Sequence, residues 1–464
     1  MSKLRFLLAL WMAKLSIPAL KITRHQGTDF PGQLALKICP NLLQYMGRPK
    51  TIIAVTGTNG KTTVSNMLAD ILEQNGYRVM GNRAGANVIS GISTAYIRAC
   101  DLFGRIRKYD VAVLEVDERS SVRVYPYVTP DYVAITNLTR DSVMRNAHPD
   151  FIAGILTRSI PRSTKLILNA DDLISCGVSP DNQRVYFGID RLDTDVKECI
   201  NLINDMRICP KCNGKLEYEY LRYHHIGRAR CRDCGFHSPD SNFLGQNVDF
   251  ANHTMTVTEE GRGYTYPLIT DNIFNAYNVL IVIATLRQMG MTHETIQQSM
   301  SRTVIDTTRY GQEQVGDVTI IKQMSKDLNA MAGSRAFDYV SSRPGRKELF
   351  LVMNNMGDAA HWSENTCWLY DTDFEFLNKD DIVQIVCADP RALDYKLRLL
   401  MAGVPEEKIT CDLNEEKAAD TLRFTPGDDV YYLYGADDWG MINRVYDYVK
   451  KLALERGGSK EVQQ

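Results

Sequence analysis

Residues 51–72 read TIIAVTGTNGKTTVSNMLADIL. The β-branched, apolar run over 52–55 predicts a buried strand, and apolar residues at helical spacing over 67–72 predict a helix. Between them, residues 57–63 form a loop that contains two glycines. Glycine lets backbone N–H groups crowd round an anion, and the start of a helix adds the positive end of its dipole. The order strand, loop, helix therefore predicts a P-loop, a loop that binds phosphate.

Two side chains of this loop predict contacts with a nucleotide. Lys61 supplies a positive charge to the terminal phosphates, and Thr62 places a hydroxyl where Mg²⁺ is bound. The Gly-Lys-Thr register favours nucleotide binding over a chance strand–turn–helix, although Val55 stands where the general motif has its first glycine. We therefore predict a shorter variant of the motif. Its expected nucleotide contacts are Thr58, Asn59, Gly60, Lys61, Thr62 and Thr63.

A second buried strand is predicted over 109–116, and it ends in acidic residues. Glu115 lies at its end and Asp117 follows. An acidic side chain at the end of a strand beside a P-loop is where a Mg²⁺ ligand belongs, so Glu115 is the candidate; a strand end facing solvent is the alternative. The alternation of strands and helices across 51–190 predicts a parallel, doubly wound α/β sheet.

The composition limits the class of protein. A chain of 464 residues is long enough for two or three domains. Its 54 Lys+Arg nearly balance its 56 Asp+Glu, so no nucleic-acid partner is expected. The 11 cysteines are odd in number and four form two close pairs, which favours a reducing, cytoplasmic compartment with a metal site over a disulfide framework.

The first 20 residues contain an apolar run over 6–13, preceded by Lys3 and Arg5. A signal peptide is not favoured, because Lys14 interrupts the run and no small-residue cleavage site follows. The run is also too short to span a bilayer. We expect an amphipathic helix that is either docked on the body of the protein or in contact with a membrane surface.

Four cysteines predict a metal site. They have the spacing C-x₂-C, 18 residues, C-x₂-C, and they are Cys209, Cys212, Cys231 and Cys234. Four thiolates at this spacing are typical of a zinc ribbon that holds structural Zn²⁺ in a closed tetrahedron. Two unrelated pairs of free cysteines are the alternative.

The loop T-G-T-N-G-K-T-T resembles the ATP loop of the Mur ligases, and residues 136–141 resemble their T-N-x-x-x-D segment. In that family ATP phosphorylates a carboxylate, and an amine then attacks the acyl phosphate. The resemblance implies that ATP and Mg²⁺ bind here. It also implies that Lys61 and Glu115 are catalytic, with Glu115 and Thr62 holding the metal.

With its four-cysteine insertion the chain resembles the MurT family, the synthetase subunits of lipid II isoglutaminyl synthase. The resemblance implies amidation of the D-glutamate α-carboxylate of lipid II, with ammonia from a GatD-like glutamine amidotransferase bound as a heterodimer. It further implies nucleotide contacts from Asn275 and Asn278, which lie one turn apart on a predicted helix; an N-cap with a polar face is the alternative. Lipid II as substrate leaves two placements open, in the cytoplasm or at the inner face of the membrane.

The C-terminal half follows the family pattern less closely. Residues 349–353 predict a strand that opens a Rossmann-like domain. Gln312 stands where the family has an arginine that contacts the nucleotide, so Arg309 becomes the candidate for that contact.

The segment W-L-Y-D-T-D-F-E over 368–375 resembles the family segment whose aspartate completes a Cys-His-Asp triad with the partner. The resemblance implies that Asp371 is this catalytic residue, and Asp358 and Asp373 are its competitors. An aspartate in such a triad orients the histidine. Alternatively, Asp371 caps the following turn.

We therefore expect an α/β enzyme in three parts. These are an N-terminal helix and arm over 1–48, a Mur-ligase-like ATP-binding domain over 49–305 with the zinc ribbon at about 205–238, and a Rossmann-like domain over 306–464. Two rival hypotheses remain. One is a carboxylate–amine ligase of the same fold without that partner, and the other is a nucleotide-binding regulatory protein that has lost turnover.

Overall fold

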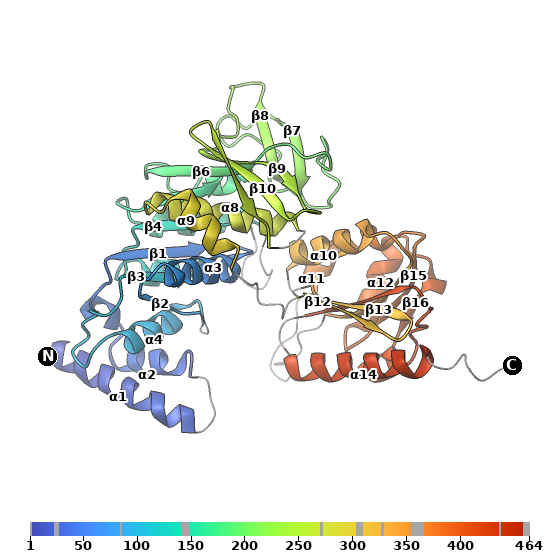
Figure 1. Cartoon of the computed structure of the whole chain (residues 1–464), viewed down its shortest axis with the longest axis horizontal. Helices are drawn as coiled ribbons and strands as arrows, with labels where there is room; N and C mark the ends of the chain where they lie inside the picture. The colour runs from blue at the N-terminus through green and yellow to red at the C-terminus, as the bar shows by residue number, and fades with distance from the viewer. Residues whose placement is uncertain are drawn as a thin grey trace. The chain divides into compact units, whose positions relative to one another are not determined.

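The computed structural model describes residues 2–22, 27–83, 86–140, 148–269, 272–302, 310–325, 329–353, 366–435 and 438–457. The chain divides into two compact units (Figure 1). The first consists of Met1–Thr139, His148–Cys199 and Asp205–Ile305, and the second of Arg140–Ala147, Ile200–Asn204 and Asp306–Gln464. Two short segments from the first half of the chain thus belong to the second unit.

The first unit is built on a nine-stranded sheet with the order β11-β10-β9-β6-β5-β4-β1-β3-β2. Its neighbours from β2 to β9 pair in parallel, and β9, β10 and β11 pair antiparallel. This confirms the predicted parallel, doubly wound sheet. The strands are β1 (Thr51–Thr56), β2 (Val79–Gly81), β3 (Val111–Glu115), β4 (Tyr132–Ile135), β5 (Lys165–Asn169), β6 (Arg184–Ile189), β9 (Phe243–Asp249), β10 (Thr254–Glu259) and β11 (Arg262–Pro267). A separate antiparallel pair consists of β7 (Leu216–Tyr223) and β8 (Ile226–Cys231).

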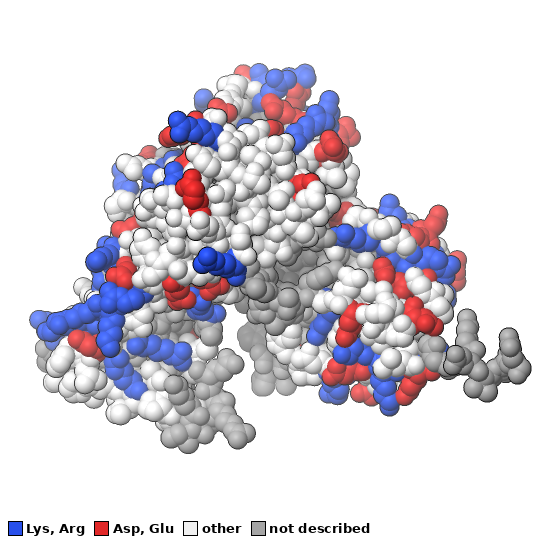
Figure 2. Space-filling view, in the orientation of Figure 1, with Lys and Arg blue, Asp and Glu red and all other residues white. Residues whose placement is uncertain are grey.

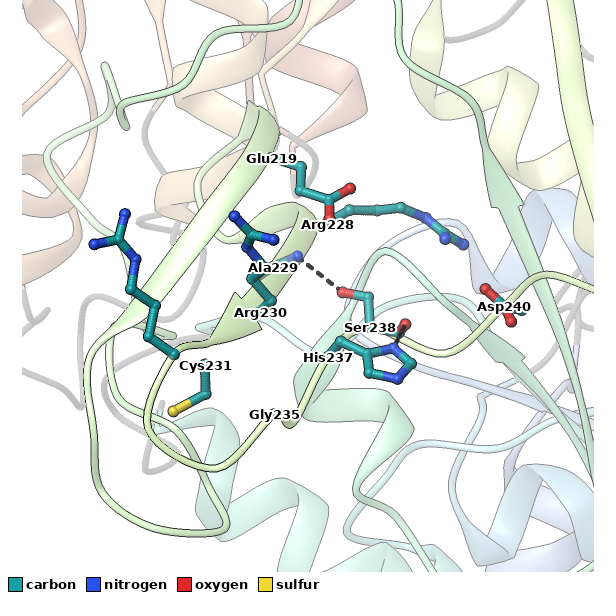
Figure 3. Close-up of a pocket in the computed structure, with 10 residues that line it drawn as sticks. Glu219, Arg228, Ala229, Arg230, Cys231, Gly235, His237, Ser238 and Asp240 are labelled. Atoms are coloured by element: carbon teal, nitrogen blue, oxygen red, sulfur yellow. Dashed lines mark hydrogen bonds between the residues drawn. The ribbon is translucent and has the colours of Figure 1, made fainter.

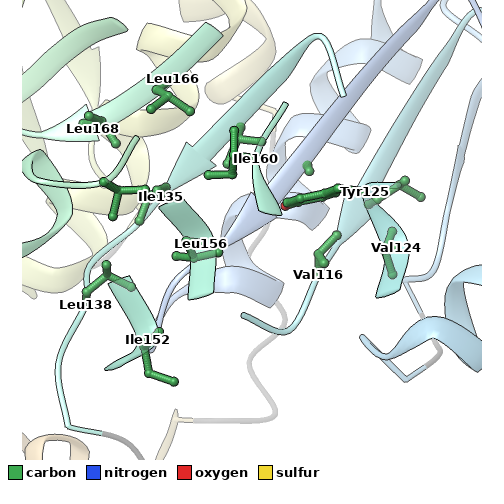
Figure 4. Packing of buried hydrophobic residues seen from close by; sticks show 14 of the residues in the cluster. Val116, Val124, Tyr125, Ile135, Leu138, Ile152, Leu156, Ile160, Leu166 and Leu168 are labelled. Atoms are coloured by element: carbon green, nitrogen blue, oxygen red, sulfur yellow. The ribbon is translucent and has the colours of Figure 1, made fainter. Parts of the chain in front are cut away.

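Helices complete this unit because the sheet needs apolar cover on its faces. On α6, Ile152 and Leu156 are buried in the same cluster as Ile135 of β4 and Leu168 of β5 (Figure 4). The helices are α1 (Ser2–Ile22), α2 (Phe30–Ile38), η1 (Leu42–Tyr45), α3 (Lys61–Gln74), α4 (Ile89–Ala99), α5 (Ser121–Val124), α6 (Pro149–Ser159), α7 (Leu173–Cys176), α8 (Ile273–Gln288) and α9 (His293–Met300). Figure 1 shows α1, α2 and α4 gathered at the N-terminal end of the unit. Among the described helices, none is long and apolar enough to cross a membrane.

The second unit has a six-stranded sheet with the order β12-β13-β17-β14-β15-β16. All neighbours except β12 and β13 pair in parallel, which confirms the predicted Rossmann-like sheet. The strands are β12 (Tyr310–Val315), β13 (Val318–Met324), β14 (Lys347–Val352), β15 (Ile382–Cys387), β16 (Ile409–Cys411) and β17 (Asp429–Tyr434). The helices are α10 (Ala330–Ser342), α11 (Cys367–Asp371), η4 (Phe374–Leu377), α12 (Ala392–Met401), η5 (Glu406–Lys408), α13 (Glu415–Ala419) and α14 (Trp439–Gly457).

Candidate active site

The predicted P-loop connects β1 to α3, and its two glycines have backbone conformations that other residues rarely adopt. Gly57 has φ 122° and Gly60 has φ 89°. A Cβ atom on Gly57 would clash with the Thr136 hydroxyl, and one on Gly60 would clash with the Asn278 carboxamide. No side chain caps the start of α3, so its first-turn N–H groups are left for an anion. The loop thus has the shape and the donors that phosphate requires.

The segment after β4, which contains Asn137 and Thr139, forms hydrogen bonds with the loop. The Thr58 N–H donates to the Asn137 carbonyl (2.8 Å), and the Asn59 N–H donates to the Asn137 side-chain oxygen (3.2 Å). The Thr58 hydroxyl exchanges hydrogen bonds with the backbone of Thr139. These bonds fix the loop conformation. They also engage the N–H groups of Thr58 and Asn59 and the Thr58 hydroxyl, so the predicted nucleotide contacts fall mainly on the residues from Gly60 to Thr63.

Lys61, at the start of α3, is held by a carboxylate that the sequence did not single out. Its ammonium donates to Glu118 Oε1 at 2.9 Å, and the Gly57 N–H donates to the same oxygen at 2.8 Å. Both side chains are largely buried. Burial alone would lower the pKa of Lys61, but the charges of Glu118, Glu115 and Asp117 outweigh it and raise that pKa, which keeps Lys61 cationic.

Glu115, the predicted magnesium ligand, lies beside the loop. β1 and β3 pair in parallel with Val55 opposite Glu115, so the end of β3 lies next to the start of the loop. Asn82 exchanges two hydrogen bonds with the Glu115 backbone, both at 2.9 Å, and Asn87 donates to the Glu115 carboxylate at 3.1 Å. This half-buried carboxylate therefore has a fixed position, and Thr62 lies in the first turn of α3.

Two predicted asparagines lie at the start of α8, against the same loop. The Asn278 side chain contacts Gly60 and donates to Asn275 Oδ1 at 3.3 Å. Asn272 caps the helix by accepting from the Phe274 N–H, so Asn275 and Asn278 are not needed as caps. The structure thus brings Lys61, Glu115 and Asn278 to one loop.

The donor set fits a magnesium nucleotide. An uncapped helix start, two glycines without room for a side chain and a buried lysine suit the phosphates. A carboxylate and a threonine hydroxyl are oxygen ligands of the kind Mg²⁺ prefers.

The four predicted ligand cysteines lie together at one end of the β7–β8 pair. Their Sγ atoms all lie within 4.8 Å of one another. Cys209 Sγ is 3.6 Å from Cys234 Sγ, and Cys212 Sγ is 3.5 Å from Cys231 Sγ. A tetrahedron of Zn–S bonds of about 2.3 Å has edges of about 3.8 Å, so the four thiols fit a tetrahedral metal ion. The N–H groups of Lys211 and Gly214 point at Cys209 Sγ and Cys212 Sγ, both at 3.4 Å, as is common around metal thiolates.

The ribbon is fixed to the large sheet through Arg222 on β7. The guanidinium donates to Asp195 (2.7 Å) and lies 3.4 Å from Asp171, whose carboxylate also accepts from the Tyr277 hydroxyl at 2.7 Å. Arg222, Asp171 and Asp195 are buried, so this network replaces water for all three charges.

A hollow of about 750 Å³ lies beside the ribbon hairpin (Figure 3). Figure 3 shows Arg228 and Arg230 on β8 among the residues that line it, together with Glu219 and Asp240. The Ser238 hydroxyl accepts from the Ala229 N–H at 3.0 Å and joins the returning chain to β8. Because charges of both signs line this hollow, it does not form a continuous basic groove.

In the second unit, Asp371 ends α11 and forms an ion pair with Arg140 (3.0 Å between Asp371 Oδ2 and Arg140 Nη1). The following turn is closed by other groups, because Thr372 donates to the Trp368 carbonyl and the Asp373 N–H donates to Ser334. Both members of the ion pair are partly exposed.

The competitor Asp373 is buried. Its carboxylate accepts from the Leu202 N–H (2.6 Å) and from the Asn201 amide (2.8 Å), and burial raises its pKa. Asp373 therefore fixes the segment Ile200–Asn204 within this unit. Arg309 and Asp358, two further predicted residues, lie outside the described residues.

Solved structures of named ligases share this architecture. A pseudomurein peptide ligase type C from Methanothermus fervidus superposes with a TM-score of 0.67 at 19% identity, over 89% of this chain and 80% of that one. MurF from Acinetobacter baumannii superposes with a TM-score of 0.63 at 14% identity, over 90% of this chain and 80% of that one. At these identities the comparison shows the fold, which is that of the Mur ligases.

Sequence comparison is more specific. Residues 55–190 match the Mur ligase middle domain, and residues 328–436 match the MurT ligase C-terminal domain. The lipid II isoglutaminyl synthase (glutamine-hydrolyzing) subunit MurT of Staphylococcus aureus strain COL is 31% identical over 402 residues, covering 85% of this chain and 88% of that protein. The subunit of the same name from Streptococcus pneumoniae is 29% identical, covering 86% and 87%. The chain belongs to the MurT family, and it is an ATP-dependent ligase.

Proposed function

We propose that this enzyme amidates the α-carboxylate of D-glutamate in lipid II, with MgATP as the phosphoryl donor and ammonia from a GatD-like glutamine amidotransferase. The meeting of Lys61, Glu115 and Asn278 at one P-loop carries the MgATP part of the proposal. Family membership supports the substrate and the partner, since the relatives are named as subunits of a glutamine-hydrolysing lipid II isoglutaminyl synthase. No disulfide joins any of the 11 cysteines, and four of them are the proposed zinc ligands, which suits a cytoplasmic enzyme.

The proposed reaction has two steps that balance. A carboxylate oxygen attacks the γ-phosphorus of ATP, and ADP leaves with the electrons of the broken P–O bond. Ammonia then attacks the carbonyl carbon, phosphate leaves with the former carboxylate oxygen, and the nitrogen loses a proton to give the amide. The protein supports the first step by positioning and by charge, because most catalysis of phosphoryl transfer is electrostatic.

Each proposed residue has a role that its surroundings support. Lys61 neutralises charge on the terminal phosphates, and its raised pKa keeps that charge at neutral pH. Glu115 and Thr62 would hold Mg²⁺, which supplies Lewis-acid stabilisation of the transferring phosphate when bound. Asn275 and Asn278 would face the nucleotide across the loop. The four cysteines would hold Zn²⁺ as a structural ion, away from the reacting atoms.

The proposal is tested by incubating the purified chain with lipid II, ATP, Mg²⁺ and ammonium. We expect ADP release that depends on lipid II and matches the amount of product, and a product lighter by the difference between OH and NH₂. Repeating the assay with glutamine, with and without a GatD-like amidotransferase, tests the partner. Release of ADP without a change in lipid II would contradict the substrate, whereas amidation from glutamine by this chain alone would contradict the partner.

A further inference from the structure

α1 packs only one of its faces on the protein. Phe6, Ala9, Leu10 and Ala13 are buried in a cluster with residues of α2 and α4. The helix is also held by Lys14, whose ammonium donates to the carbonyls of Ile97 (2.6 Å) and Cys100 (2.7 Å) at the end of α4. The fold therefore accounts fully for the inner face of the helix.

The opposite face is apolar as well, and it is exposed. Leu4, Leu8, Trp11, Met12 and Leu15 follow one another at spacings of four, three, one and three residues, which places them in one stripe. Leu4 is 74% exposed and Leu15 is 72% exposed. A helix on the surface of a soluble domain normally carries polar residues there, so a helix that is apolar on both faces requires a second apolar environment.

A loop from a distant part of the sequence extends this stripe. The Trp11 indole N–H donates to the Leu102 carbonyl at 2.8 Å, which places the loop against the outer side of α1. Leu102 and Phe103 are 59% and 60% exposed. We call this surface, made of the α1 stripe with Leu102 and Phe103, the α1 patch.

The segment that carries the α1 patch is basic, and four exposed cations lie beside the patch. The first 50 residues contain eight Lys or Arg (3, 5, 14, 21, 24, 37, 48 and 50) and one acidic residue, Asp29, a net charge of +7 in a chain whose net charge is −2. Lys3 and Arg5 flank the stripe, and Arg105 and Arg107 follow the loop; all four are exposed. The one exposed carboxylate in the loop, Asp101, accepts from the N–H groups of Phe103 and Arg105. Figure 2 shows Lys and Arg side chains gathered on the side of the first unit where α1 lies.

We propose that the α1 patch docks on an anionic lipid bilayer, with α1 lying in the plane of the interface. An apolar stripe flanked by Lys and Arg, with a tryptophan at its edge, is the combination that interfacial helices use. The inner face stays in the protein core, so only the outer face can enter lipid. The exposed cations beside the patch, Lys3, Arg5, Arg105 and Arg107, select an anionic surface over a neutral one. This inference stands on the surface of α1 and does not depend on the proposed reaction.

The test is sedimentation of the purified chain with vesicles of phosphatidylglycerol and phosphatidylethanolamine, and with vesicles of phosphatidylcholine. We expect binding to the first kind that weakens as salt is raised, and much weaker binding to the second. The double variant Leu8→Glu, Leu15→Glu should lower the partition coefficient at least tenfold, because two leucines no longer enter the acyl region. The double variant Leu393→Glu, Leu397→Glu makes the same change on the exposed face of α12 and should bind like the unaltered chain.

A second measurement does not depend on the folding of a variant. Brominated lipids should quench the fluorescence of the unaltered chain when it binds vesicles, and Trp11→Phe should remove most of that quenching. The proposal is overturned if the unaltered chain does not bind anionic vesicles. It is also overturned if the Leu8→Glu, Leu15→Glu variant binds them as well as the unaltered chain does. It is also overturned if the chain forms dimers that Leu8→Glu, Leu15→Glu dissolves and that do not bind vesicles, since the α1 patch would then join two copies.

Discussion

Lys61 is the residue whose charge the proposed phosphoryl transfer needs most. Replacing it in the Lys61→Ala variant removes a buried cation from the phosphates, and we expect ATP turnover to fall on the order of a hundredfold or more. ADP release in the presence of lipid II and ammonium measures this. Lys50→Ala, an exposed lysine just before β1, is the matched control and should keep its activity. ADP production at the control's rate would contradict the P-loop assignment.

Replacing Glu118 should strengthen the binding of a nucleotide, in contrast to the loss expected when Lys61 is replaced. Its carboxylate accepts from the Gly57 N–H and from Lys61, two donors that a P-loop offers to phosphate, so a nucleotide must exchange with it. For Glu118→Gln we expect Mg²⁺-free ADP to bind on the order of tenfold more tightly, because a strong charge-assisted hydrogen bond no longer has to be replaced. Titration calorimetry measures the affinity.

Glu115→Gln is the matched control for this charge change. It removes an equal charge near the loop, but the Glu115 carboxylate accepts a hydrogen bond from Asn87, whereas Glu118 accepts from Gly57 and Lys61. Its effect on Mg²⁺-free ADP should therefore be smaller. An equal gain in both variants would mean a general effect of charge, and weaker ADP binding by Glu118→Gln would mean that Glu118 supports the loop without competing for its donors.

The residues whose placement could be predicted are those that a short spacing along the chain defines. Lys61 follows Gly60 directly, and each pair of cysteines is separated by two residues, so a local pattern was enough. Glu118 is 57 residues from Lys61, and Asn82 is 33 residues from Glu115. Those contacts depend on which strands lie side by side. The acidic residues that follow Glu115 in the sequence were the one signal that could have pointed to Glu118.

At the scale of elements, the β7–β8 ribbon should depend on its metal. We expect about one Zn²⁺ per chain, and we expect Cys212→Ser to lose the metal together with the order of the ribbon, because binding energy at a structural site is also folding energy. Metal analysis and limited proteolysis measure these effects. The large sheet should persist, since its core cluster extends across β1, β3, β4 and β5.

Cys367→Ser, an exposed cysteine on α11, is the control for the ribbon variant and should retain the metal. Freshly purified protein without zinc would contradict the assignment. So would a Cys212→Ser variant that keeps its full metal content and its resistance to protease.

At the scale of the whole molecule, chain order did not reveal which segments belong together. Asn201 and Leu202 lie just before the ribbon in the sequence, yet they bind Asp373, 172 and 171 residues away. The second unit therefore includes Ile200–Asn204 and Arg140–Ala147. Hydrophobic periodicity identifies strands and helices, but these segments have no periodic pattern, and a single buried carboxylate decides where one of them lies.

Assembly with a glutaminase is predicted to depend on Asp371. We expect Asp371→Asn to abolish amidation from glutamine and to leave amidation from ammonium largely intact. An amide in place of the aspartate of a Ser-His-Asp triad costs about ten-thousandfold, whereas the MgATP site uses other residues. Rates with the two nitrogen sources, measured side by side in the complex, test this.

Arg140→Gln separates this role from the ion pair. It breaks the Arg140–Asp371 contact but keeps the carboxylate, so amidation from glutamine should largely survive. A loss equal to that of Asp371→Asn would assign Asp371 a structural role through the ion pair. No loss in either variant would mean that Asp371 does not serve a partner.

In the proposed reaction the carboxylate of lipid II is activated as an acyl phosphate, and the fate of its oxygens shows whether this happens. Lipid II labelled with ¹⁸O in the D-glutamate α-carboxylate is incubated with ATP, Mg²⁺ and ammonium, and the released phosphate is analysed by mass spectrometry. We expect one ¹⁸O atom in the phosphate for each amide formed, with the other retained in the amide carbonyl. Amide formation with unlabelled phosphate would contradict it.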